Sequence, residues 1–420
     1  MEEITRKRKK AKEYLAGAMG RDWMAEKMMG VMFEGKRALD ACAMELGKML
    51  AESIMYMERE EIAGPDYHPR DSRLKKWASQ RGSIYMGGQK VSVNHPRLRG
   101  RGGEIGLKSY KVLKDPSQFS EELLTKVLGG LSGRRYRETL VATANAFGVS
   151  PGSISNRVIE ATSRQISEWM ERDLSGIELF ALFLDTVHRG GVAFIVALGL
   201  DVKGDKHNLG FWEGATENHE IGEALLSDLE SRGLKLSKRT LFVTDGGGGI
   251  QKTLKRRYGE DLIHQRCTIH KGRNIQAHLP KRHRKEAHRR FVRALELKAY
   301  DDAKASLLDL EKWLRQINES AADSLLEALE EILTLHRLRV SALLRETLHS
   351  TNPIESVFSQ IRRSEKNIQR YRSSKMSRRW LGACLLNAGK GFHKVKGYRS
   401  ISEVIKNIEW EQQKEMKEAA

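Results

Sequence analysis

The 420-residue chain predicts an α/β core that is interrupted by an all-helical segment and preceded by a helical region and a small β module. Three observations predict this arrangement. Nearly continuous apolar runs at 179–187, 192–202 and 240–244 are typical of strands that are covered on both faces. Helical periodicity dominates the residues between 270 and 350. Short alternating segments separated by glycines at 76–113 are typical of a small antiparallel sheet.

The charge balance indicates which partners the chain has. Basic residues outnumber acidic ones, 74 against 55, and they are spread over the whole chain, which gives a formal charge of +19. This balance predicts a polyanionic partner, with nucleic acid favoured over an anionic membrane surface. Three cysteines are too few for a disulfide framework and suit a reducing cytosol. Neither a transmembrane run nor a signal peptide is apparent, so we expect a cytoplasmic protein without a membrane partner.

The first 63 residues are predicted to be helical. Residues 13–62 are rich in Met, Ala, Leu and Glu, contain no proline, and place apolar residues at helical spacing, which predicts one or two amphipathic helices. The methionine-rich stripe favours a core or a dimer surface over a cofactor site. The basic segment 6–12 is either a solvated end or an arm that lies along phosphates. We therefore expect region 1–63 to serve in dimerisation or as a DNA arm.

The next part, 64–115, is predicted to be the antiparallel β module. The turn sequence GPDYHPR at 64–70 marks its start. The segments GSIYM, KVSVN and EIGLKSYKV show the alternation of strands, with the basic, glycine-rich stretch 95–104 between them. That stretch is expected to be a loop, which either reaches a DNA groove or is a solvated turn.

Residues 116–174 show the pattern of a helix-turn-helix. Ala142, Ala146 and Phe147 fall on one face of a first helix, Gly148 breaks the run, and a second helix begins at Pro151. In a helix-turn-helix the second helix enters the major groove of DNA. The candidate DNA contacts are the polar residues that this helix carries outward: Ser153, Ser155, Asn156 and Arg157.

From 175 to 280 the pattern becomes βββ–α–β–α–β, and two strands end in an aspartate. Asp185 ends LFALFLD and Asp245 ends TLFVTD. A carboxylate at the end of a buried strand is costly to leave unpaired, and two neighbouring carboxylates require a cation. Hard oxygen ligands favour Mg²⁺ or Mn²⁺, and a pair of such ions supports phosphodiester chemistry. The alternative is that each aspartate merely caps a turn or the following helix.

A third acid is expected from a helix that packs on the sheet. Glu355 is the candidate, because Thr351 or Asn352 can cap a helix that has Pro353 near its start, which places Glu355 in the first turn. The alternative is that Glu355 interacts favourably with the helix dipole and does nothing more.

Four tracts together resemble a known family. The order of FLDTV, VTDGGGGI, HQRCTIHKGRN and STNPIES is similar to mutator-type bacterial transposases, and the resemblance spans roughly 75–395. Ser350 replaces the usual threonine, and the glycine run 246–249 is unusual. The resemblance implies a ribonuclease H-like catalytic domain in which Asp185, Asp245 and Glu355 form an Asp-Asp-Glu triad that holds two Mg²⁺ or Mn²⁺ ions.

Cys267 and His270 match the Cys-x-x-His of that family. A zinc site needs about four ligands, and the nearby sequence offers only His264 in addition. We therefore interpret Cys267, His270 and Asn352 as residues that support the site. The glycine run 246–249 mimics a phosphate loop but lacks the following Gly-Lys-Ser/Thr, so we interpret it as a flexible strand-to-helix turn.

The remaining segments complete the division of the chain. We expect an all-helical insertion at 281–346, a second part of the catalytic core at 347–397 and a C-terminal helix at 398–420. Between 362 and 379 eight basic residues stand beside aromatic ones, which suits single-stranded or distorted DNA, although a solvated surface has the same composition. The candidate DNA contacts in this segment are Arg362, Arg363, Arg370, Tyr371 and Arg372.

Together these features predict a DNA transposase. It would bind the terminal inverted repeats of its element, cut DNA with metal-activated water, and join the 3′-OH to target DNA. A homodimer is expected because two element ends must be handled together, and the protein would be associated with the prokaryotic nucleoid. The alternatives are a metal-dependent nuclease without strand transfer and a DNA-binding protein that has lost catalysis. A role at a membrane surface fits least, because the basic residues are not gathered on one amphipathic helix.

Overall fold

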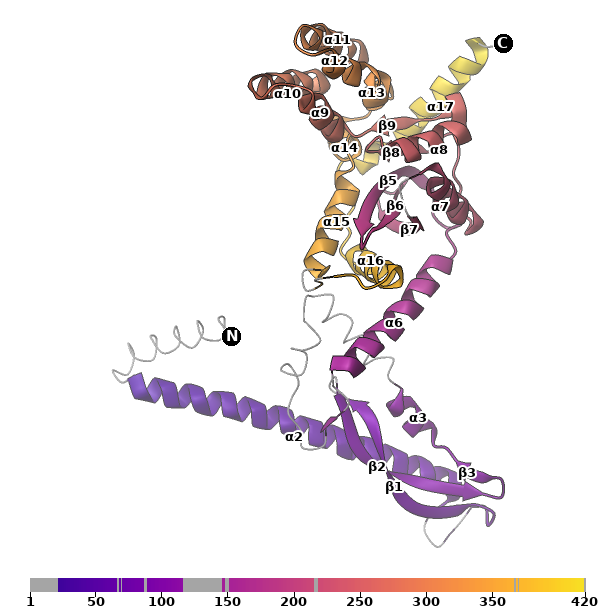
Figure 1. The fold of residues 1–420 in the computed structure, drawn as a ribbon. Helices are drawn as coiled ribbons and strands as arrows, with labels where there is room; N and C mark the ends of the chain where they lie inside the picture. The colour runs from indigo at the N-terminus through magenta and orange to yellow at the C-terminus, as the bar shows by residue number, and fades with distance from the viewer. Residues whose placement is uncertain are drawn as a thin grey trace. The chain divides into compact units, whose positions relative to one another are not determined.

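The computed structural model describes residues 22–65, 68, 70–86, 89–115, 146–147, 151–214, 218–365, 368 and 370–418. The chain forms two compact units, Met1–Ala161 and Thr162–Ala420 (Figure 1). The finer division into seven parts stays a prediction. None of the described helices is long and apolar enough to cross a membrane.

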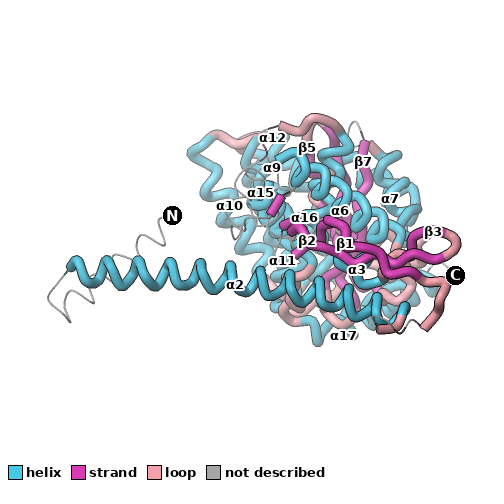
Figure 2. The backbone as a smooth tube through the Cα atoms, turned by 90° about the horizontal axis from the view of Figure 1, so that it is seen from below, coloured by secondary structure: helices cyan, strands magenta, loops and turns pink. Residues whose placement is uncertain are grey.

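The first unit is built on one long helix, α2 (Asp22–Ala63), which is 42 residues long. One of its faces carries Ala51 and Met55, which are buried against Ile84, Val93 and Leu107 of the neighbouring sheet and loop. Figure 2 shows α2 as a single extended helix. The described part of the predicted helical region is therefore one continuous helix.

The sheet of the first unit has the predicted antiparallel pairing. Strands β1 (Lys75–Met86), β2 (Gln89–Gly100) and β3 (Gly103–Ile105) follow one another in space. The predicted loop 95–104 is wrong in part, because residues 95–100 continue β2 and pair with β1 and β3. Only residues 101 and 102 form the turn.

The last predicted strand of the module, 104–112, is confirmed only at Glu104 and Ile105, which belong to β3, and from Lys108 the chain forms a helix, α3 (Lys108–Lys114). The carboxylate of Glu58, on α2, accepts hydrogen bonds from the backbone N–H groups of Lys108 and Ser109 at 2.7 and 2.8 Å. These N–H groups lie at a helix start and have no partner within the helix. The alternation in EIGLKSYKV did not reveal this cap, because Glu58 lies 50 residues earlier.

The helix-turn-helix region is described only in part. Ala146 and Phe147 form a short strand, β4, that pairs with Val91 and Lys90 of β2, so their expected place on a helix face is wrong. They extend the sheet along the end of β2 that the short strand β3 does not reach. The second helix, α6 (Pro151–Glu171), begins at Pro151 as predicted. Residues 116–145 and the side chains of Ser153, Ser155 and Arg157 lie outside the described residues, while Asn156 is exposed.

The second unit contains a five-stranded mixed sheet in the order β7-β6-β5-β8-β9. Strands β5 (Leu179–Arg189), β6 (Val192–Asp201) and β7 (Lys206–Gly214) form the predicted antiparallel meander. Strands β8 (Leu241–Thr244) and β9 (His264–Arg266) run parallel to β5. The predicted order βββ–α–β–α–β is confirmed, and this mixed sheet is compatible with a ribonuclease H-like domain.

Helices cover the sheet because its strands are apolar on both faces. Helices α7 (His219–Ser231) and α8 (Gly248–Tyr258) pack Leu225, Leu229 and Leu254 against Leu182 and Phe242. Helix α15 (Asn352–Ser364) packs beside β5, and α16 (Ser374–Gly389) packs beside β7. After the short η4 turn (Tyr398–Ser400), the chain ends in α17 (Ile401–Glu418).

The chain between β9 and α15 is helical and has a hydrophobic core of its own. Leu307, Leu314 and Leu325 are fully buried there. Its place as an insertion within a ribonuclease H-like domain stays a prediction. Six helices make up this described stretch (Figure 1): α9 (Thr268–Ala277), α10 (Lys281–Glu296), α11 (Tyr300–Arg315), α12 (Glu319–Leu326), α13 (Leu329–Arg337) and α14 (Ala342–Leu348).

Candidate active site

Asp185 lies within β5 and not at its end, so the predicted strand boundary is wrong. Strand β5 continues to Arg189 because it pairs with β6 along its whole length. The parallel pairing with β8, however, ends where Leu184 faces Thr244. Asp185 is therefore the first residue of β5 beyond its parallel neighbour, and it is 6% exposed.

Asp245 follows directly after β8, at the same edge of the sheet. The pairing of Leu184 with Thr244 places the backbones of both aspartates one step beyond the last paired residues. Gly247 donates its N–H to Asp245 Oδ1 at 2.9 Å. Gly246 has φ +93°, and a Cβ there would lie 2.2 Å from Arg266 Nε, so this turn requires glycine. The second aspartate is thus held by a constrained turn.

Glu355 lies in the first turn of α15, as predicted. Thr351 is the N-cap residue, but its hydroxyl makes no capping bond to the backbone of α15. That hydroxyl instead donates to Glu355 Oε1 at 3.0 Å. Asn352 is exposed at the start of the helix, where its N–H donates to Ser350 Oγ at 3.4 Å. Helix α15 packs beside β5, and Glu355 lies close enough to Asp185 for its charge to raise the pKa of that aspartate.

Electrostatics link the three acids. Burial raises the pKa of Asp185 to about 7, and the negative charges of Asp245 and Glu355 also raise it. The Thr186 N–H, which is 2.8 Å from Asp185 Oδ1, and the nearby His270 act in the opposite direction. Asp245 and Glu355 are therefore close enough to Asp185 for their charges to disfavour its ionised form, although the three acids are not among the described groups whose ligand atoms all lie within 4.8 Å of one another.

These acids are chemically suited to hold a divalent cation. Asp185 and Asp245 each use Oδ1 to accept a backbone N–H, which leaves Oδ2 of each without a hydrogen bond from the described residues. Hard carboxylate oxygens are the ligands that Mg²⁺ and Mn²⁺ prefer. A bound cation would relieve the repulsion that raises the pKa of Asp185.

A second group of ligand-type residues lies beside Glu355. One ligand atom each from Cys267, His270 and Glu355 lies within 4.8 Å of the others. Thr351 Oγ1, however, lies 3.5 Å from Cys267 Sγ, 3.5 Å from His270 Nδ1 and 3.0 Å from Glu355 Oε1. Because a hydroxyl already lies within reach of all three, the geometry favours a hydrogen-bonded network over a zinc site.

The charge of this network depends on the contact between Cys267 and His270. The hydrogen bond with Cys267 raises the pKa of His270 to about 9, against the effect of burial. Burial raises the pKa of Cys267, but hydrogen bonds from His270 and Thr351 outweigh it and hold that pKa below its usual value. His270 Nδ1 lies 3.8 Å from Glu355 Oε1, so a protonated imidazole offsets part of the negative charge of the acids.

A further network, which sequence reasoning missed, supports the turn that carries Asp245. His264 Nε2 lies 2.8 Å from Thr244 Oγ1, which in turn accepts the N–H of Gly246 at 3.2 Å. On the other side of the imidazole, His264 Nδ1 lies 3.7 Å from Glu331 Oε2. Glu331 belongs to α13, so the helical segment contacts the turn of the second aspartate through one buried histidine.

Polar contacts fix α13 against β9. Thr334 Oγ1 donates to the carbonyl of His264 at 2.6 Å, and the amide of Gln265 bonds the backbones of Ile332 and Leu335. Glu331 Oε2 also accepts from Gln251 of α8 at 2.9 Å. These partners come from segments that are about 70 to 80 residues apart, so no local sequence pattern could have revealed them.

The predicted DNA contacts after Glu355 fall into two groups. Arg362, Arg363, Arg370 and Arg372 are exposed. Tyr371 is half-buried, and its hydroxyl donates to Glu365 Oε1 at 2.6 Å, while Arg189 binds Oε2 of the same carboxylate at 2.8 Å. Tyr371 thus belongs to a protein network, and the four arginines are accessible to a polyanion.

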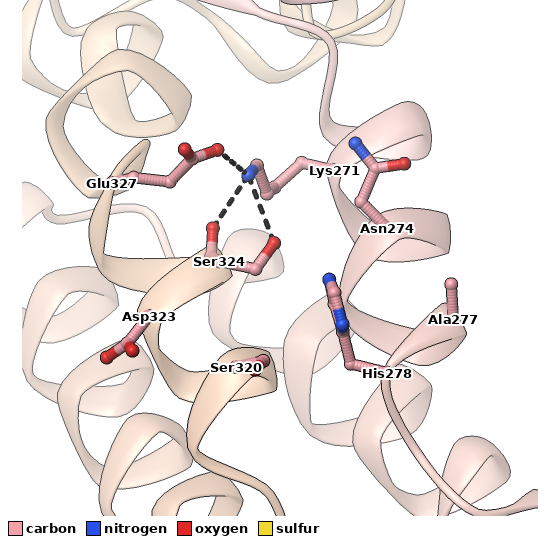
Figure 3. A pocket seen from close by; sticks show the side chains of 8 residues that line it. All are labelled: Lys271, Asn274, Ala277, His278, Ser320, Asp323, Ser324 and Glu327. Atoms are coloured by element: carbon pink, nitrogen blue, oxygen red, sulfur yellow. Dashed lines mark hydrogen bonds and ion pairs between the residues drawn. The ribbon is translucent and has the colours of Figure 1, made fainter.

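A hollow of about 530 Å³ lies between α9 and α12. Its lining does not include Asp185, Asp245 or Glu355. Figure 3 shows the buried Lys271 crossing to Ser324 and Glu327 at its upper side, with His278, Asp323 and Ser320 further along. Lys271 Nζ donates to the carbonyl of Ser324 at 2.6 Å and also pairs with Glu327. The polar groups at this end of the hollow are therefore satisfied by one another.

Comparison with known proteins places the chain in a family. It matches the transposases of the Mutator family over residues 27–394. It is 28% identical to the transposase for insertion sequence element IS905 of Lactococcus lactis subsp. lactis (strain IL1403), over 52% of this chain and 55% of that protein. It is 26% identical to the transposase for IS1201 of Lactobacillus helveticus, over 66% of this chain and 74% of that protein.

A third relative gives the same result. The chain is 24% identical to the transposase for insertion sequence element IS256 in transposon Tn4001 of Staphylococcus aureus, over 63% of this chain and 68% of that protein. The chain therefore spans about half the length of the first of these three relatives and more than two thirds of the other two. The family match covers most of the chain, so this chain belongs to the Mutator family of transposases.

Proposed function

We propose that the chain is a DNA transposase that cuts phosphodiester bonds at the ends of its element and joins the freed 3′-OH to target DNA. The observation that carries this proposal is the electrostatic coupling of Asp185 with Asp245 and Glu355 at one edge of the sheet, in a chain of this family. The pKa of Asp185, which burial and the two neighbouring carboxylates raise to about 7, is consistent with the proposed cation.

The proposed cofactor is a pair of Mg²⁺ or Mn²⁺ ions. Asp185 and Asp245 would hold one ion, and Asp185 and Glu355 would hold the other. Such a pair supplies activation of the attacking oxygen and stabilisation of the leaving oxygen in phosphodiester chemistry. No serine or tyrosine nucleophile is assigned, because this chemistry needs no covalent protein–DNA intermediate.

The chain's own residues position these acids. The turn at Gly246 and Gly247 directs the Asp245 carboxylate through the bond to Oδ1. The Thr351 hydroxyl holds one oxygen of Glu355, and Cys267 and His270 surround that hydroxyl. Preorganised acids need little rearrangement when the scissile phosphate arrives, which is how electrostatic catalysis gains its strength.

The partners follow from the reaction and from the charge of the chain. We propose that the terminal inverted repeats bind through the helix-turn-helix region and the basic β module. The arginines at 362, 363, 370 and 372, which are exposed, are proposed to contact DNA near the third acid. Two element ends must be joined in one event, which calls for a homodimer acting at the bacterial nucleoid.

The test is strand cleavage and joining with labelled element ends in Mg²⁺, Ca²⁺ or no metal. We expect Asp185→Asn, Asp245→Asn and Glu355→Gln each to lower cleavage by about a thousandfold while DNA binding is retained. Asp309→Asn and Glu260→Gln, which change exposed acids elsewhere in the same unit, serve as matched controls.

The products of this assay distinguish a transposase from a nuclease and from a DNA-binding protein that has lost catalysis. Cut ends without joined products would indicate a nuclease that lacks strand transfer. Binding without metal-dependent cleavage in the unaltered protein would indicate a DNA-binding protein that has lost catalysis. Full cleavage by the Asp185→Asn variant would refute the proposed triad.

A further inference from the structure

Helix α2 has an apolar stripe on the face that is turned away from its own sheet. Six large apolar side chains on this helix are between 52% and 69% exposed. We call them the α2 stripe: Met32, Leu46, Met49, Leu50, Ile54 and Met57. A row of exposed large apolar side chains along one helix is typical of an interaction surface.

The stripe is separate from the surface that α2 already uses. The opposite face buries Ala51 and Met55 against the β module. Glu52 accepts the N–H of Asn94 at 2.7 Å, and Glu58 caps α3. The helix therefore has one face that holds the unit together and another, apolar face that does not take part in that packing.

The spacing of the stripe fits another helix. Leu46, Leu50, Ser53 and Met57 follow one another at intervals of four, three and four residues, which is the a/d pattern of a coiled coil. The same pattern continues toward the N-terminus at positions 43, 39, 36 and 32. The helix is continuous over all of these positions.

Charge decides which helix fits. In the sequence, the a/d pattern has a basic residue at position 36, near one end, and an acidic residue at position 60, near the other. A second copy of α2 in parallel register would place like charges opposite each other at both ends. An antiparallel copy would place position 36 of each helix opposite position 60 of its partner.

One register satisfies both the charges and the apolar pattern. When the twofold axis passes near position 48, Leu46 faces Leu50 of the partner and position 39 faces Met57. Position 43 then faces position 53, and position 36 faces position 60. Every a position meets a d position, so the stripe is complementary to itself, as a twofold interface requires.

We propose that α2 forms an antiparallel coiled coil with α2 of a second copy of this chain, centred near residue 48. The contact spans positions 36–60, about 37 Å of helix. This inference names the surface of the proposed homodimer, and it rests on the exposure, spacing and charge of α2 and not on the proposed chemistry.

The first test is the oligomeric state of the full chain, measured by size-exclusion chromatography with light scattering. We expect a dimer at micromolar concentration. We expect Leu46→Glu combined with Leu50→Glu to raise the dimer dissociation constant by about a hundredfold or more, with the circular dichroism spectrum unchanged. Val112→Glu, which replaces a 72% exposed residue of α3, is the matched control and should leave the dimer intact.

The second test fixes the direction of the helices by disulfide crosslinking in a Cys42→Ser background. Ala43→Cys chains mixed with Ser53→Cys chains should crosslink under mild oxidation. Neither chain alone should do so, because the two equivalent positions lie about 15 Å apart along an antiparallel pair. In a parallel pair each chain would crosslink with itself.

Two results would overturn the proposal. One is a monomer in solution, which would mean that another part of the same chain covers the stripe. The other is crosslinking of Ser53→Cys chains with each other and not with Ala43→Cys chains. Both readouts are independent of DNA cleavage, so failure here and failure of the proposed function are distinguishable.

Discussion

Two of the buried charged residues of the second unit, Lys271 and Asp185, have opposite surroundings. Lys271 is 1% exposed, but its ammonium group reaches the Ser324 carbonyl and the Glu327 carboxylate. Asp185 is nearly as deeply buried, but the charged groups that raise its pKa are two further carboxylates. The fold therefore neutralises charge at the first place and accumulates like charge at the second.

The difference favours a structural role for the charge of Lys271 and supports the proposed role of Asp185 in the site. A buried charge with a complete set of partners stabilises the packing of α9 against α12, and removing a partner costs stability. Like charges gathered at one edge of the sheet cost stability in the absence of a cation, which is consistent with the proposed chemistry.

The largest expected effect on stability is at Lys271. Lys271→Met keeps most of the side-chain volume but removes the bonds to Ser324 and Glu327, so we expect the free energy of unfolding to fall by about 1–3 kcal/mol. Urea unfolding followed by circular dichroism measures this change. Lys312→Met, at an exposed ion pair on α11, is the control and should change stability by less than about 0.5 kcal/mol. Equal stability of the Lys271→Met and Lys312→Met variants would show that the bonds of Lys271 do not stabilise the fold.

At Asp185 we expect a substitution to raise the free energy of unfolding instead of lowering it. Because the pKa of Asp185 is raised to about 7 in the folded protein, the folded state holds a proton that the unfolded state releases near pH 4. This contribution to stability is fully present below about pH 4 and is lost as the pH rises through 7. Asp185→Asn should therefore stabilise the metal-free protein at pH 8, on the order of 1–3 kcal/mol.

The dependence of this stability difference on pH and on Mg²⁺ tests its cause. The stabilising effect of Asp185→Asn should shrink as the pH falls from 8 to 5, and saturating Mg²⁺ should reverse it by favouring the ionised aspartate of the unaltered protein. Thermal unfolding over this pH range, with and without Mg²⁺, measures both. A stability difference that does not vary with pH would contradict the raised pKa.

The smallest effect on cleavage is expected at Glu331, which links α13 to the network around His264 and the turn that carries Asp245. Glu331→Gln keeps the hydrogen bond with Gln251 within reach but removes the charge beside His264, which supports the turn at Thr244 and Gly246. We expect cleavage to fall by about tenfold and Mg²⁺ affinity to weaken, with some loss of stability because Glu331 also pairs with Lys255 and Arg266. Glu330→Gln on the same helix, which contacts Tyr300 and Lys304, is the matched control. Equal cleavage by both variants would show that α13 does not influence the turn.

The sequence predicted those parts that depend on local patterns. The apolar runs of β5, β6 and β8 identified the strands and their order, and Pro353 beside Thr351 identified the start of α15. Features that depend on distant partners were missed. Helix α3 needs the cap from Glu58, and β4 needs the free edge of β2. Asp185 lies inside its strand because β6 extends the pairing, which no run of residues around Asp185 reveals.

The site shows the same division. The apolar runs before Asp185 and Asp245, the helix start before Glu355 and the family resemblance selected the three acids, and the charges of Asp245 and Glu355 contribute to the raised pKa of Asp185. The hydroxyl of Thr351 between Cys267, His270 and Glu355 was not foreseen, because its orientation follows from the packing of α15 on α9 and β5. Likewise, His264 gained its supporting role only through contacts with Thr244 and Glu331.

The most direct test of the central claim is a Mn²⁺ titration of the full chain, followed by electron paramagnetic resonance of the free ion. We predict saturable binding that tightens as the pH rises from 6 to 8, because Asp185 must release its proton. Asp185→Asn should weaken binding by about tenfold or more and remove the pH dependence, whereas Asp309→Asn should do neither. Unchanged Mn²⁺ affinity in the Asp185→Asn variant would contradict the account.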